Sequence, residues 1–213
     1  MVEIKILVKG IHKHVEGSGD NKVFKIGSTV TLIKSNKNII VDAGYFPYKD
    51  ELVKNLKAEG LNPEDIDVVI LTHPHLDHVA NTHLFTKAKI FCKFNLEYPG
   101  QFHDPAKGYV YRVELAENTV IADDVKIILT PGHTFDMISV IVQTKQGVVV
   151  IAGDAISSEE FTNLEKEPPT MLIHDLNKYN ASRKKILKIA DYIIPGHGDI
   201  FKVTRQQADK KNN

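Results

Sequence analysis

The sequence is organised around the segment Leu71-Thr72-His73-Pro74-His75-Leu76-Asp77-His78. An apolar run precedes it at residues 66–71, bounded by the turn signal Asn62-Pro63, and is typical of a buried strand. Three imidazoles and a carboxylate then occur within six positions. In an extended or tightly turning segment His73 and His75 point the same way, since side chains alternate. Imidazole nitrogen and carboxylate oxygen are the usual ligands of zinc and similar divalent ions, so the segment predicts a metal site.

Three later apolar runs also end in a side chain that can bind a metal. They lead into Pro131-Gly132-His133, Ala152-Gly153-Asp154 and Pro195-Gly196-His197. The glycine before each ligand lets the backbone turn sharply and approach an ion closely. A single such residue is more often a cap or a surface residue, but four strand ends on one edge predict a shared site. Five His and two Asp exceed the needs of one ion and suffice for two ions about 3.5–4 Å apart that share a carboxylate and a hydroxide.

The composition is that of an ordinary soluble globular protein, with 213 residues of which 42% are hydrophobic and 25% charged. We expect one domain at residues 1–205 and a frayed tail at residues 206–213. Basic and acidic residues both number 27, so no global basic field draws the chain to nucleic acid or an anionic membrane. Cys92 is the only cysteine, and no signal-peptide core or membrane-spanning run occurs. The expected location is cytoplasmic, without a membrane partner.

Strand-like and helix-like runs alternate along the chain. Strands are expected at residues 2–9, 28–35, 38–41, 66–71, 89–92, 109–114, 125–130, 137–144, 148–152 and 192–194. Amphipathic helices are expected at residues 47–59 and 177–190, and a short helix at 79–85. Residues 10–27 are expected to form a hairpin flap, and residues 93–118 a long functional loop. His12 and His14 on the flap are interpreted as an exposed polar face, with the lining of a site as the alternative. This order predicts two face-to-face sheets with helices outside.

The spacing of the metal-binding residues resembles that of the metallo-β-lactamase fold superfamily. The match consists of His73-x-His75-x-Asp77-His78, then His133, Asp154 and His197 in that order, and it begins at Val41-Asp42-Ala43-Gly44. Softer motifs, among them Ala190-Asp191-Tyr192-Ile193-Ile194-Pro195-Gly196-His197-Gly198, resemble the subfamily of metallo-β-lactamase-domain-containing protein 1 and its prokaryotic relatives. The resemblance implies an α+β fold: a four-layer αββα sandwich of two mixed β-sheets with outer helices, and metals at one edge.

The resemblance also implies a role for each ligand. The first metal ion would be held by His73, His75 and His133, the second by Asp77, His78 and His197, and both by the bridging Asp154. Asp42 would support the site from behind. Asp77 would also act in catalysis by orienting the hydroxide that attacks the substrate. Two Zn²⁺ ions are the expected cofactors, with iron or manganese as the alternatives.

The sequence leaves the substrate open. The subfamily resemblance implies a hydrolase of phosphodiesters in RNA or single-stranded nucleic acid, and the aromatic residues Phe94, Tyr98, Phe102 and Tyr109 either stack on bases or cover the core. The same centre would serve the carbonyl of a β-lactam, lactone or thioester, while a mononuclear iron persulfide dioxygenase is a further alternative. His103 and His174 are candidate proton donors to a leaving group. The expected partner is a small molecule or single-stranded nucleic acid, and a homodimer is one option for the oligomeric state.

Overall fold

The computed structural model describes residues 2–16, 23–94, 101–104, 107, 109–112, 115–169 and 172–204. Within these ranges the side chains of His14, Glu16 and residues 101–104 and 109–112 are not described. The predicted tail at residues 206–213 lies outside the described residues, so it stays a prediction, as does the single-domain boundary at residue 205.

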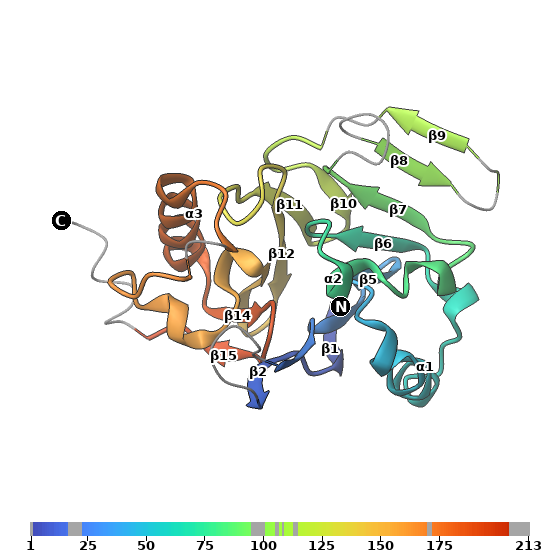
Figure 1. The fold of residues 1–213 in the computed structure, drawn as a ribbon. Helices are drawn as coiled ribbons and strands as arrows, with labels where there is room; N and C mark the ends of the chain where they lie inside the picture. Colours follow the sequence, from blue (N-terminus) through green and yellow to red (C-terminus); the bar gives the residue numbers. More distant parts are fainter. Residues whose placement is uncertain are drawn as a thin grey trace.

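The first sheet contains seven strands in the order β1-β4-β5-β6-β7-β8-β9 (Figure 1). These strands span Glu3–Val8, Val30–Lys34, Asn38–Val41, Val68–Leu71, Lys89–Cys92, Gln101–Asp104 and Tyr109–Arg112. The apolar strands β5, β6 and β7 run parallel to one another, and the other neighbours are antiparallel. The carboxyl ends of β5 and β6 therefore open at the same edge of the sheet.

The second sheet contains six strands in the order β10-β11-β12-β13-β14-β15. They span Val120–Ala122, Val125–Leu129, Ile138–Thr144, Gly147–Gly153, Tyr192–Pro195 and Phe201–Lys202. Only β13 and β14 are parallel, so this sheet is also mixed. The predicted hairpin flap is present as β2 (Ile11–Glu16) paired with β3 (Val23–Gly27), separate from both sheets.

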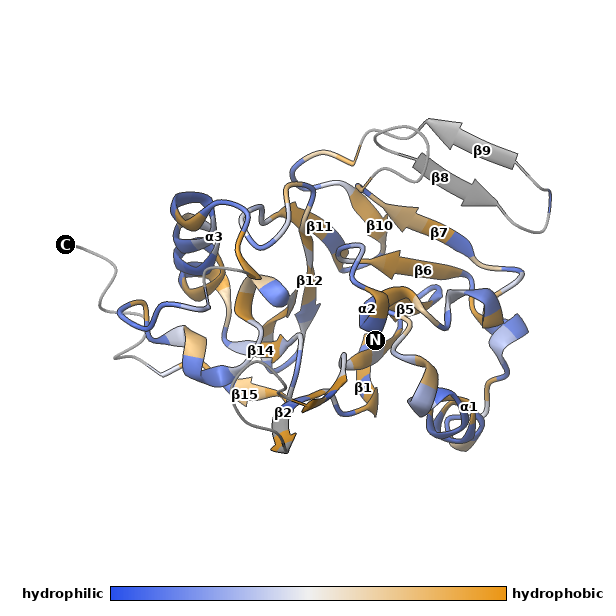
Figure 2. Cartoon of the chain, viewed as in Figure 1, coloured by the Kyte–Doolittle hydropathy of each residue, from blue (hydrophilic) through white to orange (hydrophobic). Residues whose placement is uncertain are grey.

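Three apolar clusters hold four layers together. Ile70 of the first sheet and Val140 and Ile151 of the second belong to the cluster between the sheets. Leu56 of α1 (Lys49–Ala58) packs on the outer face of the first sheet, and Ile186 of α3 (Leu176–Ile189) packs on the outer face of the second. Figure 2 shows the apolar residues concentrated along the strands of both sheets. The predicted αββα sandwich of two mixed sheets is confirmed.

Local structure departs from the sequence prediction in two places. The short helix predicted at residues 79–85 is wrong: α2 spans Leu76–Val79 and a 3-10 turn follows at Thr82–Leu84. The helix begins at Leu76 because His75 before it is extended, so Asp77 and His78 belong to a helical turn. Residues 93–118 are not all irregular, since they contain β8 as well as β9. None of the described helices is both long enough and apolar enough to cross a membrane.

Cys92 is expected to resist alkylation in the folded protein. Its side chain is fully buried at the end of β7, and burial raises the pKa of its thiol to about 12. Because the thiolate is the reactive form, iodoacetamide should label the native protein far more slowly than the urea-unfolded protein at mildly alkaline pH. Mass spectrometry of the labelled chain measures this, and rapid labelling of the native protein would contradict the buried placement.

Candidate metal centre

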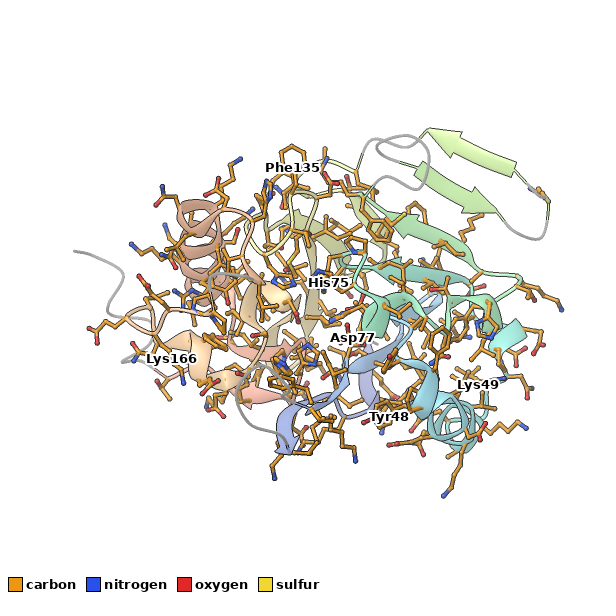
Figure 3. The ribbon with its side chains drawn as sticks, viewed as in Figure 1. Tyr48, Lys49, His75, Asp77, Phe135 and Lys166 are labelled. Atoms are coloured by element: carbon orange, nitrogen blue, oxygen red, sulfur yellow. The ribbon has the colours of Figure 1, made fainter. Side chains whose placement is uncertain are left out.

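Four strand ends converge at one edge of the sandwich, as the sequence predicted. The turn after β6 carries His73 and His75, and α2 carries Asp77 and His78. His133 follows β11, while Asp154 follows β13 and His197 follows β14. Figure 3 labels His75 and Asp77 close to each other near the centre of the view. All seven predicted metal-binding residues therefore meet, in two groups that could each hold an ion.

The first group contains His73, His75, His133 and Asp154. His75 Nδ1 lies 3.0 Å from both His73 Nε2 and His133 Nε2. Asp154 Oδ2 lies 3.3 Å from His133 Nε2 and 3.9 Å from His73 Nε2. Zinc–nitrogen bonds of about 2.0–2.1 Å in a tetrahedron place ligand atoms about 3.3 Å apart, which is close to this spacing.

The second group contains Asp77, His78 and His197. Asp77 Oδ2 lies 3.7 Å from His78 Nε2 and 3.7 Å from His197 Nε2. Asp154 reaches this group with its other oxygen, because Oδ1 lies 3.5 Å from His78 Nε2 and 3.3 Å from His197 Nε2. One carboxylate oxygen thus faces each group, and the arrangement fits a dinuclear metal site.

Buried polar atoms without a hydrogen-bond partner support this fit. Asp77 Oδ2, His78 Nε2 and Asp154 Oδ1 are all buried, and none of them has a hydrogen-bond partner. An unpaired buried polar atom costs about 1–3 kcal/mol, more when it is charged, so a native site retains three such atoms only for a purpose. All three belong to or face the second group, so a cation bound there would satisfy them.

Comparison with known proteins identifies the family. The model of the metallo-beta-lactamase superfamily matches residues 24–197, which is most of the chain. This chain belongs to the metallo-beta-lactamase superfamily. Membership and the two side-chain groups together make it a metal-dependent hydrolase, as predicted.

Several relatives within the superfamily share a large part of the sequence. Metallo-beta-lactamase domain-containing protein 1 of Xenopus laevis is 35% identical over 99% of this chain and 87% of its own length. The human protein of that name is 29% identical, and this chain spans only 60% of it. A probable metallo-hydrolase of Methanocaldococcus jannaschii is 34% identical over 77% of this chain and 73% of its own length. The predicted subfamily resemblance is confirmed.

Solved structures of the superfamily share the fold. A probable metal-dependent hydrolase from Staphylococcus aureus superposes with a TM-score of 0.72 at 13% identity, covering 97% of this chain and 94% of its own. An N-acyl homoserine lactone hydrolase, with its product N-hexanoyl-L-homoserine bound at the catalytic metal centre, superposes with a TM-score of 0.66 at 18% identity. That alignment covers 92% of each chain.

Asp42 lies behind the site and orients one imidazole of each metal group. Its Oδ2 lies 2.7 Å from His78 Nδ1, so that nitrogen carries the hydrogen and Nε2 keeps its lone pair for a metal. Asp42 also accepts hydrogen bonds from the Thr72 amide at 2.8 Å and the Thr72 hydroxyl at 2.9 Å. Since that hydroxyl hydrogen is committed to Asp42, Thr72 Oγ1 must accept the Nδ1 hydrogen of His73 at 3.0 Å. His73 therefore also presents a free Nε2.

His197 is oriented in the same way by the β2–β3 hairpin. Its Nδ1 lies 3.0 Å from the carbonyl oxygen of Gly27, which can only accept a hydrogen bond. The Nδ1 atom therefore carries the hydrogen, and Nε2 faces the metal groups. The hairpin is thus part of the support of the site, which the sequence did not indicate.

Burial and charge set the protonation of the ligands. Burial lowers the pKa of His73, His75 and His133, which keeps these imidazoles in the neutral form that binds metals. Burial alone would raise the pKa of Asp154, but the charged forms of His197 and His78 outweigh it and hold that pKa well below its usual range, just as Asp154 helps to raise the pKa of both imidazoles. A bound cation would replace their Nε2 protons and favour the carboxylate in the same way. Asp154 is therefore a carboxylate, as a shared metal ligand must be.

Glycine is required before the ligands for two different reasons, backbone conformation and lack of space. Gly153 has a φ of 52° and Gly132 a φ of 140°, which residues with a side chain rarely adopt. At Gly196 the backbone is ordinary, but a methyl group would overlap Asp154 Oδ1. Gly132 and Gly153 thus have the unusual backbone conformation of a sharp turn, and Gly196 approaches a ligand's carboxylate closely. The predicted close approach to an ion stays a prediction.

A cavity of about 230 Å³ opens onto both metal groups. Its walls come from the hairpin, from the loop after β13 and from α3. His12 of β2 lines it, with its ring 5.5 Å from the ring of His197. His12 is exposed, as predicted, and it also borders the cavity, which is the alternative that the His-x-His pattern of the hairpin offered.

Apart from Phe94, only His174 among the predicted substrate residues has a described side chain that can be placed relative to this cavity. Tyr98 lies outside the described residues, and the side chains of Phe102 and His103 on β8 are not described. His174 is exposed and does not line the cavity, and its ring packs edge-on against Phe135 at 6.1 Å. Phe94 is only 4% exposed and belongs to the core under α1, so it cannot stack on a base.

Asp42→Ala is expected to weaken metal binding about 10–100-fold at both groups, because Asp42 holds His78 directly and His73 through Thr72. Asp42 has a φ of 56°, a conformation that asparagine also tolerates. Asp42→Asn is therefore the matched variant that removes the charge without backbone strain. Competition with a chromophoric chelator measures both affinities. Two ions bound at the wild-type affinity in both variants would contradict this role.

Proposed function

We propose that this hydrolase cleaves a carboxylic ester, thioester or lactone with an apolar substituent, using two zinc ions. The composition of the cavity wall carries the proposal: six apolar residues line it, namely Ile26, Phe161, Pro168, Pro169, Leu172 and Ile173. Glu160 also lines it, whereas none of its described lining residues is a lysine or an arginine. Phosphodiester chains are bound mainly through such cations, so the wall favours an acyl group over RNA.

The roles of the ligands follow the two groups described above. One ion would be held by His73, His75 and His133. The other would be held by Asp77, His78 and His197, and Asp154 would contribute to both groups. When bound, the ions lower the pKa of a water ligand and polarise the carbonyl oxygen of the substrate.

Two further residues act in the proposed reaction. Asp77 lines the cavity beside the group to which it belongs, so its carboxylate can also accept a hydrogen from the attacking water and orient it. Burial raises the pKa of Tyr179 to about 12, so its hydroxyl keeps the proton and lines the cavity as a neutral donor. The apolar wall meanwhile excludes competing water from the acyl group.

A substrate panel tests the proposed function. Purified protein loaded with zinc is assayed against nitrophenyl esters, an acyl thioester, an acyl lactone, a chromogenic cephalosporin and end-labelled RNA and single-stranded DNA. We expect turnover of the ester-type substrates at least about tenfold above the others, and its loss on dialysis against a chelator. Chelator-sensitive cleavage of RNA without turnover of any carbonyl substrate would overturn the proposal in favour of a nuclease. Bound iron with persulfide oxidation would overturn it in favour of a dioxygenase.

A matched pair of variants tests the apolar wall. Leu172→Asp places a carboxylate in the wall, and we expect kcat/KM for a hexanoyl substrate to fall about tenfold more than kcat/KM for its acetyl counterpart. Val120→Asp is the control, because Val120 is a 72% exposed apolar residue of β10 outside this cavity. Equal losses on both substrates for Leu172→Asp would contradict acyl binding at this wall.

A further inference from the structure

The outer edge of β1 is open. β1 is the end strand of the first sheet and pairs only with β4 (Figure 1). Beside it lies a cavity of about 660 Å³ that none of the seven metal-binding residues lines. Its apolar lining comes from both sheets: Val2, Ile4 and Ile6 on one side, and Val149, Tyr192, Ile194 and Ile200 on the other.

The β1 edge has the features of a strand that pairs with another strand. It is six residues long, contains no proline and bears a single lysine, and its one register shift against β4 falls between Ile6 and Val8, so residues 3–6 keep a regular edge. Val2, Ile4 and Ile6 are half-buried and pack toward the core between the sheets, while the alternating Glu3 and Lys5 are exposed on the other face. A partner strand at this edge would extend the sheet and cover the open side of the core.

The sequence of β1 is complementary to itself in one register. Two copies related by a twofold axis perpendicular to the sheet pair antiparallel, and side chains directly opposite each other share a face. With Ile4 opposite Ile4 of the second copy, Val2 faces Ile6 and Glu3 faces Lys5, so apolar residues meet apolar ones and opposite charges meet. Shifting the centre to Glu3 or Lys5 brings like charges together. A register that pairs odd-numbered residues of one copy with even-numbered residues of the other would put the apolar side chains of one copy on the face that bears Glu3 and Lys5 in the other.

We propose that two copies of this chain form a homodimer through antiparallel pairing of their β1 strands, with Ile4 on the twofold axis. The two seven-stranded sheets then continue across the interface. This inference does not depend on the substrate, because β1 contributes no residue to the metal cavity.

Disulfide cross-linking tests the register. Ile4→Cys places two thiols opposite each other at the axis, and we expect a mild oxidant to convert most of this variant into a covalent dimer. Ile6→Cys is the matched control, because Ile6 faces Val2 of the second copy and should stay mainly uncross-linked. The buried Cys92 gives no background. Equal cross-linking of the two variants, or none of Ile4→Cys, would overturn the register.

Charge reversal tests the interface without touching the core. Glu3→Lys sets two lysines opposite each other, and we expect the dimer dissociation constant in sedimentation velocity to rise about tenfold. The double variant Glu3→Lys with Lys5→Glu restores opposite charges and should recover most of the affinity. Lys5 also lies 4.0 Å from Glu59 of its own chain, so Glu3→Lys is the cleaner single change. A monomeric wild-type protein, or a dimer indifferent to all these variants, would overturn the proposal.

Discussion

Asp154→Asn is expected to reduce hydrolysis at least about 100-fold and to leave fewer than two metal ions bound per chain. The reason is geometric: Oδ2 faces His133 and His73, whereas Oδ1 faces His78 and His197, all within 3.3–3.9 Å. Asparagine keeps the shape but loses the charge, and it presents an amide hydrogen to one of the two groups. Metal content by elemental analysis, with kcat/KM on the best ester-type substrate, measures the effect.

Asp199→Asn is the matched control for this change. Asp199 lies two residues after His197 in sequence but on the surface, where it pairs with Lys9. An exposed pair of this kind contributes little, so the variant should keep both ions and full activity. An Asp154→Asn variant with two ions and wild-type kcat/KM would exclude a shared role for Asp154. It would also move the catalytic centre away from this cavity.

Arg183→Met is expected to lower the free energy of unfolding by about 3–5 kcal/mol. The Arg183 side chain of α3 is fully buried, and its guanidinium donates to the carbonyl oxygens of Phe161, Asn163, Leu164 and Lys166. Its guanidinium carbon also lies 4.9 Å from the Tyr179 ring centre. Methionine fills part of the volume but removes a donor from all four carbonyl oxygens, of which that of Asn163 keeps the Lys166 amide at 3.0 Å. Equilibrium urea unfolding measures the loss.

The same substitution is expected to impair substrate binding, because the loop that Arg183 ties down supplies Glu160 and Phe161 to the cavity. KM for the hexanoyl substrate should therefore rise in Arg183→Met at temperatures where the variant is still folded. Lys184→Met is the matched control, since Lys184 is exposed on the next position of the helix. If Arg183→Met unfolded at the same urea concentration as Lys184→Met, the buried guanidinium would not be holding the loop.

The metal groups were predictable from the sequence because residue type and the preceding apolar run are enough to identify each ligand. Each ligand directly follows an apolar run, and parallel neighbours such as β5 and β6, or β13 and β14, necessarily end at a common edge. Residue type and position therefore identified the seven ligands, among them His73, His75, Asp77 and Asp154. The layered fold was predictable for the same reason, since the apolar periodicities of strands and helices determine which faces are buried.

Features that depend on contacts between distant segments were not predictable. Arg183 is charged and was unremarkable in the helix pattern, yet it is buried because a loop folds over it. His12 joins the cavity only because the hairpin bends over His197.

The amino-acid sequence by itself determined which side chains can bind metal and at which strand ends they stand, because ligand chemistry and strand periodicity are properties of the local chain. The tertiary structure alone decided that Asp154 turns one oxygen to each group and that Asp42 orients two imidazoles. It also decided that the cavity wall is apolar. Those properties arise from distances between residues far apart in sequence, which packing of the whole sandwich sets.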